Sequence, residues 1–223
     1  QRLICSISCG AQHTVALTTG GGVWAWGEND CGQLGLNDTE DRHTPCVVTE
    51  NIGELVIQGI TTGSQHTVVW QREESVFVWG RGTEGQLGYG NAGIENTVDI
   101  HVGDESSKPQ RCPLPENVSI KSVTAGDSHT LFVSRQGKVY ACGNNMSGQL
   151  GLGQDKKCQV KPKRVDAGLK EETIAVISAG NAHSAAVSSH GKLYTWGAGW
   201  HGRLGQSISL FAECLMFNVS KHG

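Results

Sequence analysis

Short apolar runs alternate with glycine-containing polar turns along the chain, and the same order of runs returns four times. Each copy contains three runs of β-forming residues that are too short for ordinary helices. In the first copy they lie at 3–8, 14–18 and 23–26. The later copies place them at 55–61, 67–70 and 76–79, at 120–125, 130–134 and 138–142, and at 174–179, 184–188 and 192–196. This pattern predicts three strands in each copy.

A weaker fourth run follows in the first three copies, at 45–49, 109–112 and 162–165, and each begins with a proline. Proline has no N–H to donate, so it suits the start of an edge strand. A four-stranded unit of about 50 residues is typical of small sheets that stack to bury both faces. The predicted units are about 1–49, 50–113, 114–166 and 167–206. The tail at 207–223 departs from the repeat, and it either lies outside the fourth unit or supplies a substitute closing strand.

Each copy also carries three motifs in fixed register. The first is a Gly-x-x-His turn, the second is a residue followed by glycine 13 positions after the histidine, and the third begins 19 positions after the histidine. The histidines are His13, His66, His129 and His183, and the second position holds Trp26, Trp79, Cys142 and Trp196. The third motif is Gly-Gln-Leu-Gly, with arginine replacing glutamine in the fourth copy. Constant offsets in four copies exclude coincidence.

These motifs closely resemble the regulator of chromosome condensation repeats, and the resemblance covers about residues 3–206. It implies an all-β fold, a β-propeller built of four-stranded antiparallel blades, of which the family has seven. Seven units of this length would need on the order of 370 residues. We therefore expect about four blades, an arc that is incomplete or open relative to the seven-bladed family.

Composition and charge narrow the function classes. Glycine supplies 31 of the 223 residues and proline only 5, so the chain is rich in turns without being of low complexity. A net charge of −3 requires neither a nucleic-acid partner nor a membrane surface. No stretch approaches the roughly 20 apolar residues of a membrane span, and the first residues lack the apolar segment of a signal peptide. We expect a cytoplasmic or nuclear protein with no membrane partner, and no nucleic-acid or chromatin binding by this segment.

The 8 cysteines include no Cys-x-x-Cys pair, which indicates free thiols in a reducing compartment. The repeated histidines and tryptophans are interpreted as structural. Neighbouring sheets stand roughly 10 Å apart, whereas zinc ligands lie about 2.0–2.3 Å from the ion, so the four histidines cannot share a metal. Each imidazole is expected to bond to backbone in the turn before its strand. Cys142 at a tryptophan position indicates a buried packing site.

Two segments, 80–85 and 197–202, match the Gly-x-Gly-x-x-Gly motif of dinucleotide-binding loops. That motif needs a following helix to receive the pyrophosphate, and strands follow here. Asn29 and Asn145 replace the second glycine in the other two copies, which predicts a left-handed residue at that position. No nucleophile, base and acid recur together, so we expect no cofactor, no metal and no enzymatic catalysis.

Function is therefore expected on the loops. One candidate set lies in the Gly-x-x-His turns: Gln12, Gln65, Asp127 and Asn181. A second lies in an insertion at 89–107, which holds Glu95, Asp99, Asp104 and Glu105 and no lysine or arginine. Both sets indicate a protein-protein interaction scaffold, with a plain solvated spacer as the alternative for the insertion. The basic residues of 156–164 either meet an acidic or phosphate group or form a solvated loop.

The resemblance also implies an alternative, a guanine-nucleotide exchange factor for a Ran-like small GTPase. In the family member with that activity, acidic residues of the Gly-x-x-His turns face the GTPase. Among the four turns here only Asp127 supplies such a residue. A third possibility is a regulatory domain that accompanies a ubiquitin ligase or a kinase, as these repeats often do.

Overall fold

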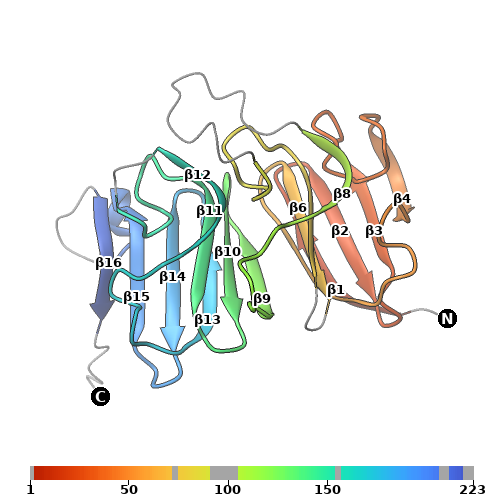
Figure 1. Cartoon of the computed structure of the whole chain (residues 1–223). Coiled ribbons are helices and arrows are strands. Elements are labelled where there is room, and N and C mark those ends of the chain that lie inside the picture. Colours follow the sequence, from red (N-terminus) through yellow and green to blue (C-terminus); the bar gives the residue numbers. More distant parts are fainter. Residues whose placement is uncertain (1–2, 72–74, 91–104, 154–156, 206–210, 218–223) are drawn as a thin grey trace, which may run out of the picture.

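The computed structural model describes residues 3–71, 75–90, 105–153, 157–205 and 211–217. It contains four antiparallel sheets of four strands each, and the strands of each sheet follow in chain order (Figure 1). The first sheet holds β1 (Ile4–Cys9), β2 (His13–Thr18), β3 (Val23–Gly27) and β4 (Arg42–Val48). The second holds β5 (Ile57–Thr62), β6 (His66–Gln71), β7 (Val76–Gly80) and β8 (Ser106–Arg111).

The remaining two sheets repeat this order. The third holds β9 (Ile120–Ala125), β10 (His129–Ser134), β11 (Val139–Asn144) and β12 (Cys158–Arg164). The fourth holds β13 (Ile174–Ala179), β14 (His183–Ser188), β15 (Leu193–Ala198) and β16 (Phe211–Phe217), with a short 3-10 helix, η2 (Trp200–Gly202), before β16. None of the helices among the described residues is long and apolar enough to cross a membrane.

Consecutive sheets stack face to face as blades around an arc, and the first strands β1, β5, β9 and β13 contact one another along its inner side. Three apolar clusters fill the three spaces between sheets. The all-β propeller-blade architecture expected from the repeats is therefore confirmed.

The fourth strands differ in detail from the prediction. They begin three or four residues before the expected prolines, so Pro45, Pro109 and Pro162 lie inside β4, β8 and β12. Each proline coincides with a register shift against the neighbouring strand, as between Ala25 and Gly27. A bulge on an edge strand leaves one residue unpaired, which accommodates a residue without an N–H.

The tail supplies the fourth strand of the fourth sheet. β16 pairs antiparallel with β15, with Leu193 opposite Phe217 and Ala198 opposite Phe211. Of the two alternatives for 207–223, the structure has the substitute strand, so residues 211–217 belong to the fourth blade.

One backbone carbonyl joins each blade to the next. The carbonyl of Gln33 in the first blade accepts hydrogen bonds from Thr67 Oγ1, at 2.8 Å, and from Trp79 Nε1, at 2.9 Å, both in the second blade. The hydroxyl of Thr67 also lies 3.0 Å from His13 Nε2. Because that hydroxyl gives its single hydrogen to the carbonyl, it must accept from the imidazole. We call this set of three bonds the blade lock.

The lock recurs at both later interfaces. The second is formed by His66, Thr130, Gln86 and Cys142, and the third by His129, Ser184, Gln149 and Trp196. The expected bond from histidine to backbone is therefore wrong, because the imidazole reaches a hydroxyl of the following blade. The sequence motifs did not show this partner, because the threonine or serine that bonds each histidine belongs to the next copy of the repeat. In that copy it directly follows the motif histidine.

The lock explains the other repeated residues. Trp79, Cys142 and Trp196 are fully buried, as predicted for packing positions. Trp26 is half-buried, because it lies on the face of the first sheet that is turned away from the second. A Cβ on Gly63 would overlap the imidazole of His66, which accounts for the glycine of the Gly-x-x-His turn.

The lock histidines are held neutral. Burial lowers the pKa of His13 to about 4 and of His129 to about 3. Burial and repulsion from the neighbouring imidazoles lower the pKa of His66 to about 3. With Nε2 donating, Nδ1 carries the lone pair, and within the described residues it has no hydrogen-bond partner in any of the four histidines.

We expect Trp79→Phe to lower the free energy of unfolding by about 1–2 kcal/mol, because it removes one donor to the Gln33 carbonyl and some buried volume. Urea denaturation provides the measurement. Trp24→Phe, a half-buried tryptophan of the same chain, is the control and should cost less than half as much. Equal losses in the two variants would contradict the lock.

We also expect stability to fall on acidification below pH 6.5. The unfolded chain protonates its histidines near that pH, whereas the folded pKa values of His13, His66 and His129 are about 4, 3 and 3. The contribution of the neutral histidines to the free energy of unfolding is therefore complete above pH 6.5. It is lost as the pH falls towards 4, by about 1.4 kcal/mol per pH unit for each histidine. Urea denaturation from pH 7.5 to 4.5 measures the slope. His66→Asn should make the slope shallower, and an unchanged slope would show that this histidine is not buried neutral.

Candidate protein-interaction surface

The four Gly-x-x-His turns form one continuous surface at one end of the arc. The amide of Ala11 donates to the backbone carbonyl of Ser64 at 3.0 Å, and the amide of Ser64 donates to the backbone carbonyl of Asp127 at 3.3 Å. The amide of Asp127 donates in turn to the carbonyl of Gly180 at 3.3 Å. The turns surround a shallow depression of about 260 Å³. We call this end of the molecule the turn end.

The predicted side chains of the turns lie at this end. Gln12 is exposed and donates to Glu28 at 2.8 Å, whereas Gln65 accepts from Arg81 at 2.8 Å. Asp127 is half-buried and accepts a bond from the hydroxyl of Ser128, and Asn181 is exposed. The structure therefore brings the four turns together on one surface. Whether these residues bind a partner stays a prediction.

The acidic insertion is only partly visible. Glu95, Asp99 and Asp104 lie outside the described residues. In an antiparallel sheet the connection from the third to the fourth strand leaves from the same end as the turn between the first two strands. β7 therefore ends, and β8 begins, at the turn end of the second sheet.

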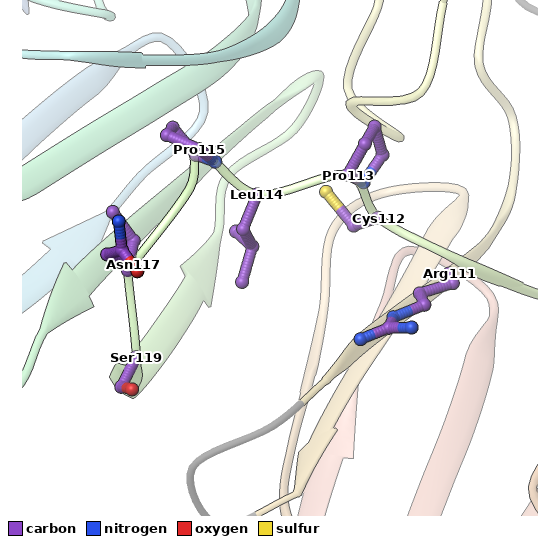
Figure 2. A pocket seen from close by; sticks show the side chains of 8 residues that line it. Arg111, Cys112, Pro113, Leu114, Pro115, Asn117 and Ser119 are labelled. Carbon is purple, nitrogen blue, oxygen red and sulfur yellow. The ribbon is translucent and has the colours of Figure 1, made fainter.

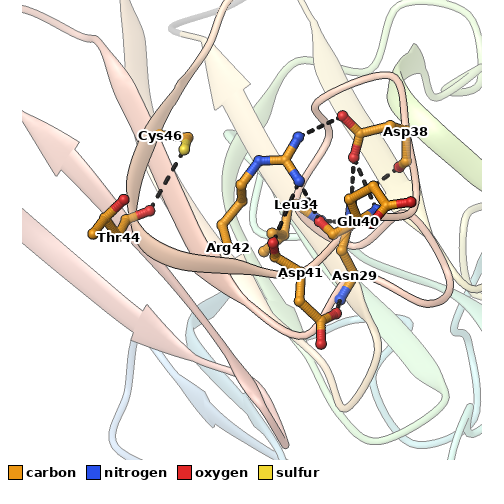
Figure 3. A network of polar contacts seen from close by, with 8 residues as sticks. All are labelled: Asn29, Leu34, Asp38, Glu40, Asp41, Arg42, Thr44 and Cys46. Atoms are coloured by element: carbon orange, nitrogen blue, oxygen red, sulfur yellow. Dashed lines mark hydrogen bonds and ion pairs between the residues drawn. The ribbon is translucent and has the colours of Figure 1, made fainter.

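A second group of acids, which the sequence interpretation did not single out, lies on the loop between β3 and β4 (Figure 3). We call residues 28–41 the acidic loop. It contains Glu28, Asp30, Asp38, Glu40 and Asp41. The available signal was the density of acids in a stretch that has no basic residue before Arg42.

Part of the acidic loop is structural. Asn29 is fully buried and anchors it: its Oδ1 accepts from the amide of Leu34 at 2.9 Å, and its Nδ2 donates to Asp38 at 3.0 Å. Asp41 accepts from the amide of Asn29, and Asp38 forms an ion pair with Arg42. Asp30 and Glu40 are exposed. The loop therefore has a rigid base and presents carboxylates to solvent.

The left-handed residue expected at Asn29 and Asn145 is wrong. Neither has a positive φ, and Gly199 at the same position has a φ of −92°. The left-handed residues are the flanking glycines, such as Gly27 and Gly32. Asparagine occurs at this position because its side chain bonds the loop, as Asn145 Oδ1 does with the amide of Leu150 at 3.1 Å.

The second blade touches the acidic loop. Burial, together with the neighbouring carboxylates of Glu105 and Asp30, raises the pKa of Cys31 to about 12. The amide of Asn37 donates to the carbonyl of Ser107 at 2.7 Å. The described end of the insertion, at Glu105, therefore lies beside the acidic loop.

Besides Arg42 beside the acidic loop and Arg81 at the turn end, basic residues lie along β12. Lys161 and Lys163 are exposed, and Arg164 pairs with Asp166 at 2.9 Å. Within the described part of the chain, no three histidine, cysteine or carboxylate side chains are placed to hold a metal ion.

A hollow of about 690 Å³ lies along the connection from β8 to β9 (Figure 2). It is lined by Arg111, Cys112, Pro113, Leu114, Pro115, Asn117, Val118 and Ser119. This lining contains no histidine and no carboxylate, so it offers no general base of the usual kind.

Comparison with known proteins agrees with this geometry. The Regulator of chromosome condensation (RCC1) repeat matches residues 20–70, 73–133 and 136–187, and a second form of the repeat matches 4–33, 120–149 and 174–203. The chain is 38% identical to the ultraviolet-B receptor UVR8 of Arabidopsis thaliana over 209 residues, which are 92% of this chain and 43% of UVR8.

Two solved structures of a yeast protein also match. One is Prp20p from Saccharomyces cerevisiae, in a study of its binding properties to Gsp1p and histones, with 26% identity, a TM-score of 0.77 and coverage of 95% of this chain and 49% of that one. The other is yeast RCC1 (Prp20) bound to Kap60, with 24% identity, a TM-score of 0.79 and coverage of 96% and 48%. The chain thus spans about half the length of these relatives. Since the repeat matches well over half of its residues, the chain belongs to the regulator of chromosome condensation (RCC1) repeat family.

Proposed function

We propose that this chain is a non-catalytic protein-binding domain that receives a basic partner at its turn end. The observation that carries the proposal is the union of the four turns into one hydrogen-bonded surface with the acidic loop at the same end. Gln12 bonds Glu28 and so links a turn directly to that loop.

The charges at the turn end favour a basic partner. Asp30, Glu40 and Glu105 are exposed, and none of the three takes part in an ion pair among the described residues. Arg81, a basic residue at this end, donates to Gln65 and to Thr83. Complementary charges speed association and select partners more than they add affinity.

Relatives support a protein partner of this kind. Prp20p is described by its binding to histones, which are basic proteins, and yeast RCC1 has been solved with Kap60. The proposal therefore replaces the expectation that this segment does not bind chromatin. A scaffold whose loops vary from copy to copy suits such binding, because loops tolerate changes that the sheets do not.

The double variant Asp30→Lys, Glu40→Lys should weaken binding to purified core histones about five- to tenfold at 0.1 M salt, because two exposed attractive charges become repulsive. Fluorescence anisotropy with labelled histones gives the dissociation constant. Glu50→Lys, Glu54→Lys is the matched control, since both acids are exposed on the connection that follows β4, at the opposite end. Equal weakening by both pairs, or no binding by the unaltered chain, would contradict the proposal.

A further triple variant, Glu95→Lys, Asp99→Lys and Asp104→Lys, separates the insertion from the acidic loop. We expect weaker histone binding from this variant as well. Unchanged binding would remove the insertion from the surface and leave the acidic loop in place.

Guanine-nucleotide exchange on a Ran-like GTPase is the second candidate. It is favoured by Asp127, an acidic residue in the Gly-x-x-His turns that borders the depression of the turn end. If the chain has this activity, it should speed release of a fluorescent GDP analogue from Ran, and Asp127→Ala should remove most of the acceleration. Release at the spontaneous rate in the presence of the unaltered chain would exclude exchange activity for this segment while leaving histone binding untouched.

A further inference from the structure

The interface between the second and third blades departs from the other two. Its lock has Cys142 where the other interfaces have Trp79 and Trp196. A second cysteine, Cys112, lies directly after β8 and is also buried.

The two sulfur atoms approach the same point. A Cβ placed on Gly88 would stand 2.9 Å from Cys112 Sγ and 3.2 Å from Cys142 Sγ. Because both sulfurs lie this close to one point, the distance between them is at most about 6 Å. The two thiol groups also interact electrostatically, since Cys112 contributes to the raised pKa of Cys142.

The next interface shows which positions these cysteines occupy. There a Cβ on Gly151 would stand 3.0 Å from Val165 Cγ1 and 3.1 Å from Trp196 Nε1. Cys112 and Cys142 thus take the places of a valine and a tryptophan that pack against each other across a blade interface. A disulfide requires two sulfur atoms that can close to bonding distance, and this position places both thiols against the same backbone site, Gly88.

The cysteine lock is also the weakest of the three. Cys142 Sγ donates to the carbonyl of Gln86 at 3.6 Å, whereas the indole donors lie 2.9 and 2.8 Å from their carbonyls. A thiol is a poor donor. An added covalent bond would therefore stabilise the interface with the least hydrogen bonding.

We propose that Cys112 and Cys142 are a redox-sensitive pair that a peroxide converts into a disulfide, which joins the second and third blades covalently. One thiolate attacks hydrogen peroxide, breaks the O–O bond and becomes a sulfenic acid while hydroxide leaves. The second thiolate attacks the sulfenic sulfur, forms the S–S bond and expels the oxygen as a second hydroxide. In total two thiols and one peroxide give one disulfide and two waters.

The reduced pair is stable in the resting protein. Burial raises the pKa of Cys112 to about 12, and burial with the adjacent Cys112 raises the pKa of Cys142 well above its ordinary value. Thiolates are the reactive species, so oxidation requires transient opening of the interface and proceeds slowly. The disulfide between Cys112 and Cys142 would therefore form during sustained oxidation and not during brief exposure to peroxide.

Peptide mapping of the unaltered chain tests the pair. N-ethylmaleimide first blocks the exposed thiols of Cys5 and Cys9 in the folded protein. After hours in hydrogen peroxide, the protein is unfolded, alkylated with iodoacetamide and digested with trypsin without reduction. We expect the tryptic peptide 112–121 linked to 139–156, lighter by two hydrogens than the sum of the two. Recovery of Cys112 and Cys142 on separate peptides, as alkylated thiols or sulfinic acids, would overturn the proposal.

Thermal melting gives a second readout. The disulfide should raise the melting temperature of the oxidised chain over the reduced chain by roughly 5–10 °C, because it restricts the unfolded state. Cys142→Ser should abolish this difference, whereas Cys46→Ser, which alters a half-buried cysteine outside the pair, should preserve it. An equal shift in both variants would assign the effect to another thiol.

Discussion

A single backbone carbonyl at each blade interface carries the arrangement of this molecule. The carbonyls of Gln33, Gln86 and Gln149 each receive a hydroxyl and an indole or thiol from the next blade. The hydroxyl in turn receives the imidazole of the preceding blade. Sheets alone could slide over one another, because apolar contacts have little direction. The lock fixes their register. It requires a neutral histidine, a glycine beside the imidazole ring and a constant spacing between the motifs of each copy.

The position of the lock also organises the interaction surface. The histidine begins the second strand, so the bond that joins two blades lies directly beneath the turn that carries Gln12 or Asp127. The lock bonds and the backbone hydrogen bonds between neighbouring turns fix the position of each turn, and the side chains of the turns can differ among the four copies. The acidic loop follows the same plan. Asn29 ties its base to the Gln-Leu-Gly segment, while Asp30 and Glu40 face solvent. Binding function can therefore vary without a change in the fold.

The repeat register made the blades predictable. Four copies in one register predicted the strands, the glycine turns and the burial of Trp79 and Trp196.

The register could not identify the partner of His13, because Thr67 lies 54 residues away and belongs to the motif of another copy. Asn29 was misassigned because glycine and asparagine share a backbone preference, although the buried asparagine acts through its side chain. The fourth strands were predicted to begin at their prolines, although they begin three or four residues earlier, because a bulge that accommodates proline cannot be recognised from composition. The acidic loop could not be singled out from the sequence because its charges lie within a repeat, whereas the insertion departs from the repeat length. Three of the insertion's acids lie outside the described residues.

The most direct test of the lock is a double-mutant cycle on His66 and Thr130, which join the second and third blades through one hydrogen bond of 3.0 Å. The free energies of unfolding of the chain, His66→Ala, Thr130→Val and the double variant would be measured in urea at pH 7.5. The lock predicts a coupling energy of about 1 kcal/mol or more, since either change alone removes the shared bond. Losses that add within about 0.3 kcal/mol would show that the two side chains act independently and that the lock does not hold these blades together.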